Sequence, residues 1–144
     1  MNKKQRNMSG FTLLEIMVVI VILGVLASMV IPNLLGNKEK ADRQKVVSDI
    51  AALENALDMY KLDNSRYPTT EQGLDALVAM PDVDPEPRDY RAGGYIKRLP
   101  QDPWGNEYLL VSPGENGQVD VYSIGLDGEE GSDDDIGNWN MHDK

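Results

Sequence analysis

Residues 10–31 read GFTLLEIMVVIVILGVLASMVI, and this stretch decides the fold of the chain. From Phe11 to Ile31, 17 of the 21 residues are apolar and Glu15 is the only charged one. A helix of this length is roughly 31 Å long, which matches the hydrocarbon core of a bilayer. The sequence therefore predicts a transmembrane helix over residues 11–32.

The segment ahead of this run, residues 1–10, carries three basic residues and no acidic one. Positive flanks stay in the cytoplasm, so the remainder of the chain is expected on the other side of the membrane. A cleavable secretory signal is the alternative. The apolar run is long for such a signal and no A-x-A site closes it, which favours a retained anchor.

Glu15 is the exception within the apolar run. A carboxylate inside a spanning helix costs about 2.5–3.5 kcal/mol, so it requires a cation or a hydrogen-bond donor nearby. No Lys or Arg occurs between Phe11 and Asn37, so that partner is a newly made N-terminal amine or a group on another chain. Alternatively, the side chain reaches the headgroups, because it lies only four residues inside the run.

The charge of the chain excludes several classes of function. Its 144 residues carry a net charge of -10, and the acidic groups lie almost entirely beyond residue 32. An acidic surface cannot release the counterions of nucleic acid, so DNA and RNA are not expected partners. With no cysteine, the chain has no disulfide, thiolate zinc site or thiol nucleophile.

Helical periodicity continues beyond the apolar run. Pro32 is expected to kink or locally unwind the helix. The helix then resumes, with apolar residues on one face at spacings of three and four. They are Val46, Ile50, Leu53, Leu57 and Tyr60. Residues 63–68 are expected to end this amphipathic helix, and a short second helix is expected from about Thr70 to Val78.

The second half of the chain predicts loops and short strands. Residues 80–91 are rich in Pro and Asp and are expected to form a loop. Residues 108–111 and 119–122 read as two strands joined by a turn at 113–117. Together with Trp104, this antiparallel hairpin is expected to pack on the amphipathic helix, giving an α+β architecture.

The C-terminal region contains a strongly acidic loop. Six of the nine residues from Asp127 to Asp135 are acidic, and glycines surround them. Carboxylates and carbonyls on a flexible loop form the oxygen-rich site that Ca²⁺ prefers. The spacing is not that of an EF-hand. A solvated acidic loop without metal is the alternative, since runs of charge are usually solvated.

The N-terminal sequence resembles the class III signal of type IV pilins and pseudopilins. Its residues are Gly10 to Glu15, after a short basic leader and before an unbroken apolar run. The resemblance implies that a prepilin peptidase cleaves between Gly10 and Phe11 and methylates the Phe11 amine. Glu15 then becomes the fifth residue and meets the N-terminal amine of a neighbouring subunit.

Within that superfamily, nearly the whole chain resembles the major pseudopilins of type II secretion. The matching segments are Gly10 to Glu15, ADRQK (41–45), YPTTEQGL (67–74), LPQDPWG (99–105) and DDDIGNW (133–139). Pilins of the pilus type usually have a C-terminal disulfide loop, which this cysteine-free chain lacks. The resemblance places a calcium site in the acidic loop. Its ligands would be the carbonyls of Ile124 and Ser132 and the side chains of Asp127, Asp134 and Asp135.

The resemblance also implies a fold, a topology and a set of partners. The fold is type IV pilin-like: a cleaved leader (1–10), a helix in the membrane or filament core (11–32) and a periplasmic domain (33–144). The chain would polymerise with itself into the periplasmic pseudopilus that drives folded proteins across the outer membrane. Its other partners would be prepilin peptidase, minor pseudopilins, the inner-membrane platform, the outer-membrane secretin and the secreted proteins.

Other functions were weighed against this one. The only histidine, His142, lies next to the C-terminus, and the chain has no catalytic serine, metalloprotease or phosphate-loop motif, so an enzyme is not expected. A pilin of the type IV pilus and a minor pseudopilin remain as alternatives. A monomeric, membrane-anchored periplasmic calcium-binding module is a further one, but a monomer has no use for the costly Glu15.

Overall fold

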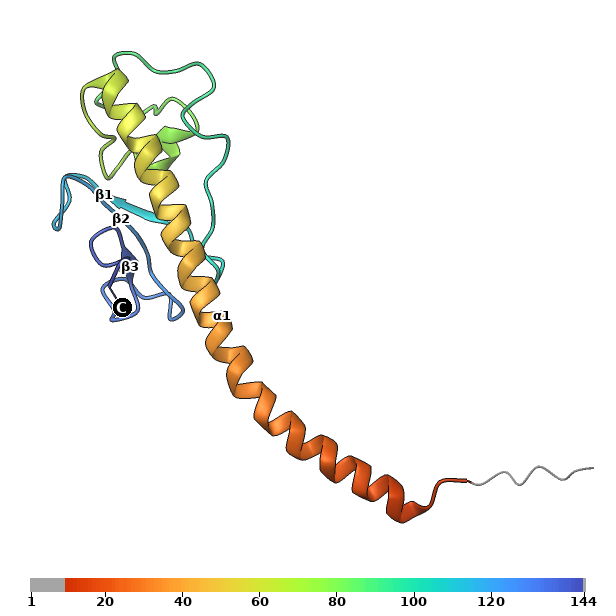
Figure 1. Cartoon of the computed structure of the whole chain (residues 1–144). Helices are drawn as coiled ribbons and strands as arrows, with labels where there is room; N and C mark the ends of the chain where they lie inside the picture. The colour runs from red at the N-terminus through yellow and green to blue at the C-terminus, as the bar shows by residue number, and fades with distance from the viewer. Residues whose placement is uncertain (1–9, 144) are drawn as a thin grey trace, which may run out of the picture. The chain divides into compact units, whose positions relative to one another are not determined.

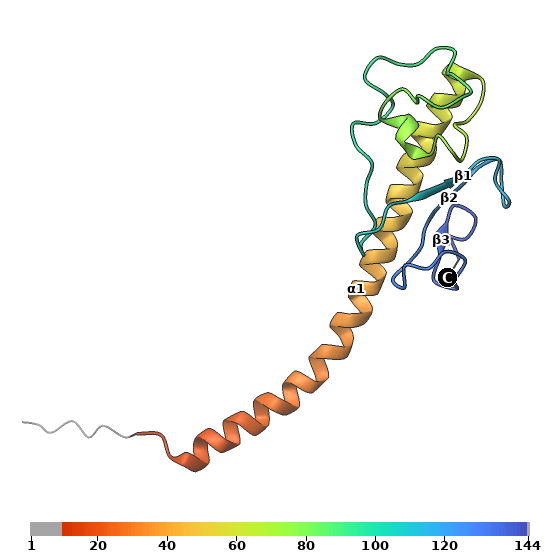
Figure 2. The same ribbon diagram turned by 180° about the vertical axis from the view of Figure 1, so that it is seen from behind.

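The computed structural model describes residues 10–143, and of residues 30–35 it describes the backbone only. The leader predicted at residues 1–10 therefore lies outside the described residues except for Gly10. One helix, α1 (Leu13–Asn64), is followed by the 3₁₀ helix η1 (Leu74–Leu77) and the strands β1 (Leu109–Val111), β2 (Asp120–Ser123) and β3 (Ile136–Gly137). Figure 1 shows these elements and Figure 2 shows them from behind.

Helix α1 is 52 residues long and is helical without interruption from Leu13 to Asn64. The prediction of an unwound stretch near Pro32 is therefore wrong, while a kink at this position stays a prediction. A proline removes a single backbone hydrogen bond, and the turns on either side keep theirs. The chain divides into two compact units, residues 1–40 and 41–144, and α1 contributes to both.

The second unit contains a three-stranded antiparallel sheet of order β1-β2-β3. Strand β2 is central, pairing Leu110 with Val121 on one side and Ser123 with Ile136 on the other. The hairpin predicted from the sequence is confirmed to within one residue at each strand end. Strand β3 was not predicted, because two residues are too few to show an alternating pattern.

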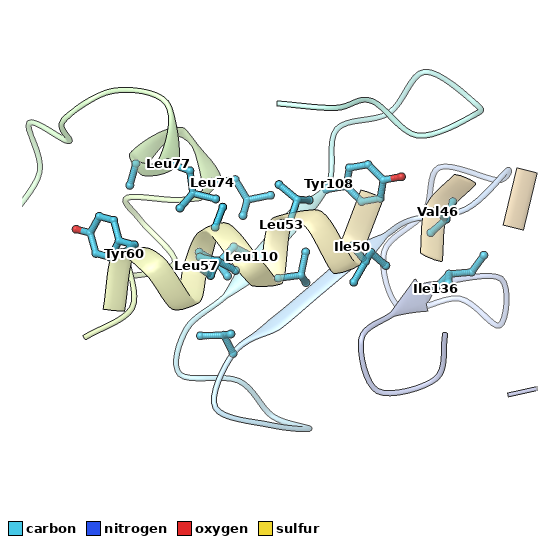
Figure 3. Packing of buried hydrophobic residues seen from close by; sticks show 14 residues of the cluster. Val46, Ile50, Leu53, Leu57, Tyr60, Leu74, Leu77, Tyr108, Leu110 and Ile136 are labelled. Atoms are coloured by element: carbon cyan, nitrogen blue, oxygen red, sulfur yellow. The ribbon is translucent and has the colours of Figure 1, made fainter. Parts of the chain in front are cut away.

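The apolar face predicted for residues 46–60 is the centre of the core. Val46, Ile50, Leu53, Leu57 and Tyr60 are each at most 1% exposed. Figure 3 shows them in contact range of side chains from η1, the sheet and the segments beside it. The others labelled there are Leu74, Leu77, Tyr108, Leu110 and Ile136. Trp104 packs against the same cluster, so the predicted α+β layering is confirmed.

The short helix and the Pro-rich loop that follow α1 agree with the sequence predictions. The short helix is confirmed, but as a 3₁₀ turn at Leu74–Leu77. Residues 80–91 contain no helix or strand, as their Pro content predicted. This loop is held on the end of α1 by Asn64, whose side-chain oxygen accepts from the Asp89 amide at 3.0 Å. Arg66 also donates to the carbonyl oxygen of Pro85 at 2.7 Å.

Two leucines of α1 should differ strongly in how much they contribute to the stability of the domain. Leu57 is fully buried, whereas Leu62 is 81% exposed. Leu57→Ala is expected to lower the free energy of unfolding by about 2–5 kcal/mol, since it removes buried methyl groups and leaves a cavity. Leu62→Ala, the matched control, should change it by less than about 0.5 kcal/mol. Urea unfolding of the full chain in detergent measures both, and equal losses would contradict this view of the core.

Candidate functional site

The N-terminal residues of interest lie at the start of α1. Gly10 and Phe11 precede the helix, and both are exposed. Thr12 caps the helix, because its Oγ1 accepts from the Glu15 amide at 3.2 Å and its carbonyl accepts from the Ile16 amide at 3.2 Å. The Gly10–Phe11 peptide bond is therefore on non-helical backbone.

Glu15 lies in the first turn of α1, where a carboxylate interacts favourably with the helix dipole. Thr12 and Glu15 have the spacing of a capping box, which would give Glu15 a local role at the start of the helix. Only the Thr12 half of that motif is formed among residues 10–143. Within the same range, no ion pair involves Glu15.

The surface around Glu15 is apolar and uncovered. Every large apolar side chain from Phe11 to Met29 is at least 47% exposed. Such an extensive apolar surface requires lipid or other chains to cover it. Among the residues that the structure describes, no helix is both long enough and apolar enough to span a membrane.

The acidic loop connects β2 to β3 and depends on glycine. Gly125, Gly128 and Gly131 have φ angles of 68°, 70° and 88°, a conformation that favours glycine. A Cβ atom at Gly125 would also lie 2.7 Å from the Asp134 carbonyl oxygen. The loop can therefore fold back on itself only because Gly125 has no side chain.

Asp134 joins the two ends of this loop. Its Oδ2 accepts from the amides of Leu126 at 2.8 Å and Asp127 at 3.2 Å, and its Oδ1 accepts from the Ser132 hydroxyl. These donors hold the pKa of Asp134 below its ordinary value, with the Ser132 hydroxyl having the largest effect. The carboxylate is therefore in its charged, ligand-competent form at neutral pH.

Asp135 and Asp127 complete the predicted set of side-chain ligands. The Asp135 carboxylate accepts from the Gly131 amide at 2.8 Å and from the Ser132 hydroxyl at 3.3 Å. Asp127 accepts from the Glu129 amide at 2.9 Å. The structure thus brings Asp134 and Asp135 together at Ser132, and it places the backbone of Asp127 against Asp134.

The donor chemistry of the loop fits Ca²⁺, since the predicted ligands are carboxylate and carbonyl oxygens within one flexible loop. In the part of the chain that the structure describes, no three acidic or histidine side chains form a group that could hold a metal ion. Hydrogen bonds to amides and to Ser132 occupy these carboxylates instead. Ligand exchange from those donors to a cation would be required for binding.

Glu130 has a different role from its acidic neighbours. Its Oε1 accepts from the Tyr122 hydroxyl, a residue of β2. The pKa of Tyr122 is raised, mainly because the phenol is buried and secondly because of this hydrogen bond. Glu130 therefore anchors the loop to the sheet, a role that composition alone could not distinguish from metal binding.

A chain of hydrogen bonds also connects the loop to α1, and it was not predicted. Asn140 Nδ2 donates to the Asp135 carbonyl at 3.0 Å, and Asn140 Oδ1 accepts from the Gly137 amide at 2.8 Å. Arg43 on α1 then donates to the carbonyls of Asn140 at 3.2 Å and Asp143 at 2.9 Å. Asn140 and Arg43 thus connect the acidic loop to the helix.

Comparisons with known proteins agree over nearly the whole chain. Residues 33–139 match the family model "Type II secretion system (T2SS), protein G", and residues 5–31 match the "Prokaryotic N-terminal methylation motif". The type II secretion system core protein G of Aeromonas hydrophila is 75% identical over 140 residues, covering 97% of this chain and 98% of that protein. The corresponding Vibrio cholerae protein is 69% identical over 144 residues, covering 98% of each.

A solved structure is similar as well. The crystal structure of the major pseudopilin from the type 2 secretion system of enterohaemorrhagic Escherichia coli matches with a TM-score of 0.72 and 65% sequence identity. The match covers 76% of this chain and 96% of that one. At 65% identity, the two chains share most of their aligned residues as well as the fold.

The contact between Arg43 and the C-terminal turn leads to a prediction. Arg43→Lys keeps the charge but cannot reproduce two donors from one planar group. The free energy of opening this turn should therefore fall by about 1 kcal/mol. The amides of Met141 and Asp143, which bond within this turn, should exchange faster with deuterium. Arg88→Lys on an exposed loop is the control. Unchanged exchange in Arg43→Lys would show that the turn holds without the guanidinium.

Proposed function

This chain belongs to the type II secretion protein G family, and from that membership we propose how its N-terminus, its Glu15 carboxylate and its acidic loop act in filament assembly. It is a structural subunit of the type II secretion pseudopilus, and its family is not an enzyme family. The observation that carries this function is the combination of a protein G domain at 33–139 with a methylation motif at 5–31.

The N-terminus is the proposed processing site. Prepilin peptidase would cleave between Gly10 and Phe11, remove the leader 1–10 and methylate the Phe11 amine. The support is the matched methylation motif together with the exposed, non-helical backbone at these residues. Cleavage here would place the new amine four residues ahead of Glu15.

The proposed topology is a single membrane anchor. Residues 11–32 would cross the inner membrane with the N-terminus in the cytoplasm, and residues 33–144 would form the periplasmic domain. The support is the uncovered apolar surface from Phe11 to Met29 and the basic residues that precede it. The inner-membrane platform, minor pseudopilins, outer-membrane secretin and secreted proteins are the proposed partners.

Glu15 is the proposed assembly residue. In the membrane, its carboxylate is costly unless it meets a cation. The methylated amine of Phe11 on a neighbouring copy would supply that cation as the subunit leaves lipid for the filament. Apolar side chains would exchange lipid for other helices, and this transfer has little net hydrophobic gain. One ion pair can therefore determine whether a subunit joins the filament.

Substitutions of Glu15 test this proposal. Glu15→Gln should insert in the membrane and be cleaved but form few filaments, because the neutral amide cannot pair with the amine. Glu15→Asp, which keeps the charge, should retain part of the assembly. Filament yield from the periplasmic fraction of the cells measures assembly, and mass spectrometry of the purified chain checks cleavage and methylation at Phe11. Normal filaments from a correctly processed Glu15→Gln chain would refute the role.

The acidic loop is the proposed calcium site. The carbonyls of Ile124 and Ser132 and the side chains of Asp127, Asp134 and Asp135 would hold the ion. The support is the oxygen-only donor set and the way Ser132 gathers Asp134 and Asp135. Bound calcium would neutralise carboxylates that otherwise repel one another, and it would stabilise the C-terminal part of the domain.

Calcium should therefore raise the stability of the folded subunit. Binding to the native state alone adds about 2.7 kcal/mol at a hundredfold excess over Kd. The full chain in detergent should melt several degrees higher with Ca²⁺ than with chelator, and Mg²⁺ should do less. Asp134→Ala should abolish the difference.

Asp133→Ala is the matched control, because it removes one charge from the same exposed loop and Asp133 is not a proposed ligand. It should keep the calcium response. Simple screening of a solvated loop predicts a different pattern. Ca²⁺ and Mg²⁺ would then act alike, monovalent salt would replace either, and both variants would respond equally.

A further inference from the structure

The connection between β1 and β2 is folded around one side chain, that of Asp120. This loop extends beyond the ends of the two strands (Figure 1). Asp120 begins β2 and is only 3% exposed, although it is charged. A Cβ atom at Gly114 would lie 2.7 Å from Asp120 Oδ1, so the loop backbone lies directly against the carboxylate.

Four nitrogens of the loop donate to this carboxylate. The amide of Glu115 donates to Oδ2 at 2.8 Å, and the amide of Gly117 donates to Oδ1 at 3.1 Å. Asn116 donates to Oδ2 twice, from its backbone amide and from its side-chain Nδ2, each at 3.0 Å. These bonds satisfy a buried charge and fix the conformation of the turn.

Asn116 and Gly117 form a dipeptide with its own covalent chemistry. The Gly117 backbone nitrogen can attack Cγ of Asn116, forming a new C–N bond. The bond from Cγ to Nδ2 then breaks, and Nδ2 leaves as ammonia with the proton lost from Gly117. Water opens the resulting succinimide to aspartate or isoaspartate. Glycine favours this attack because it has no side chain in the way.

We propose that Asn116 is a deamidation site that Asp120 keeps inactive in the folded subunit. The nucleophile, Gly117 N, and the leaving group, Asn116 Nδ2, both donate to the same carboxylate. The attack requires a deprotonated Gly117 nitrogen, and a carboxylate oxygen 3.1 Å from that nitrogen disfavours the negative charge that deprotonation creates. Reaction therefore requires the loop to leave Asp120 by local opening.

The modification would be irreversible in its effect on the loop. Deamidation replaces the Nδ2 donor with a second carboxylate at a position 3.0 Å from Asp120 Oδ2. Like charges at that distance repel, and isoaspartate also lengthens the backbone of the turn. A subunit that has opened and reacted thus cannot reform this loop around Asp120.

Peptide mapping of the full chain in detergent tests the proposal. Deamidation at Asn116 is followed in mildly alkaline buffer by the mass difference between amide and acid, for the native chain and for the chain in concentrated urea. The native rate should be at least about tenfold lower, because only the open loop reacts. Equal native and unfolded rates would overturn the proposal without any variant.

A pair of variants identifies Asp120 as the cause. Asp120→Asn, confirmed as folded by circular dichroism, should deamidate at Asn116 faster than the parent chain. Adding Gly117→Ala should suppress that gain, and the folded loop accepts it, since a Cβ at Gly117 meets no atom closer than 3.6 Å. A folded Asp120→Asn chain that reacts at the parent rate would overturn the role of the carboxylate.

Discussion

Burial of one stripe of helix α1 is the interaction on which the rest of the structure depends. The sheet has strands of three, four and two residues, too short to be stable without a surface to pack on. The helix supplies that surface through side chains from Val46 to Tyr60. The strands, η1 and the segments beside them are folded because they cover this stripe (Figure 3).

The same helix carries a second apolar surface that no described part of the chain covers. From Phe11 to Met29, large apolar side chains are exposed. The two surfaces have opposite requirements, since one is satisfied within the chain and the other only by lipid or other subunits. This division suits a subunit that folds alone and assembles afterwards, in agreement with membership of the pseudopilin family.

The features of this structure that could be predicted from the sequence are those that depend on residues close together in the chain. The buried face of α1, the hairpin and the Pro-rich loop were predictable, because spacing and turn residues act within a few positions. Strand β3, the Glu130 to Tyr122 bond and the Arg43 contact were not. Arg43 and Asn140 are 97 positions apart, and no local pattern indicates that they meet. The unwinding predicted at Pro32 does not occur, because neighbouring helical turns outweigh one lost hydrogen bond.

The loops of this domain are ordered without disulfides, and buried polar side chains provide that order. Asp102, 4% exposed, accepts from the amides of Trp104 and Asn106 and from the Ser123 hydroxyl. Asp120 has the same role in the hairpin, and the half-buried Asn138 ties the C-terminal turn to β2. Each acts on backbone groups that no strand or helix satisfies. Because a lost hydrogen bond at Asp102 or Asp120 leaves a buried polar group unsatisfied, truncation of either side chain is expected to destabilise the domain.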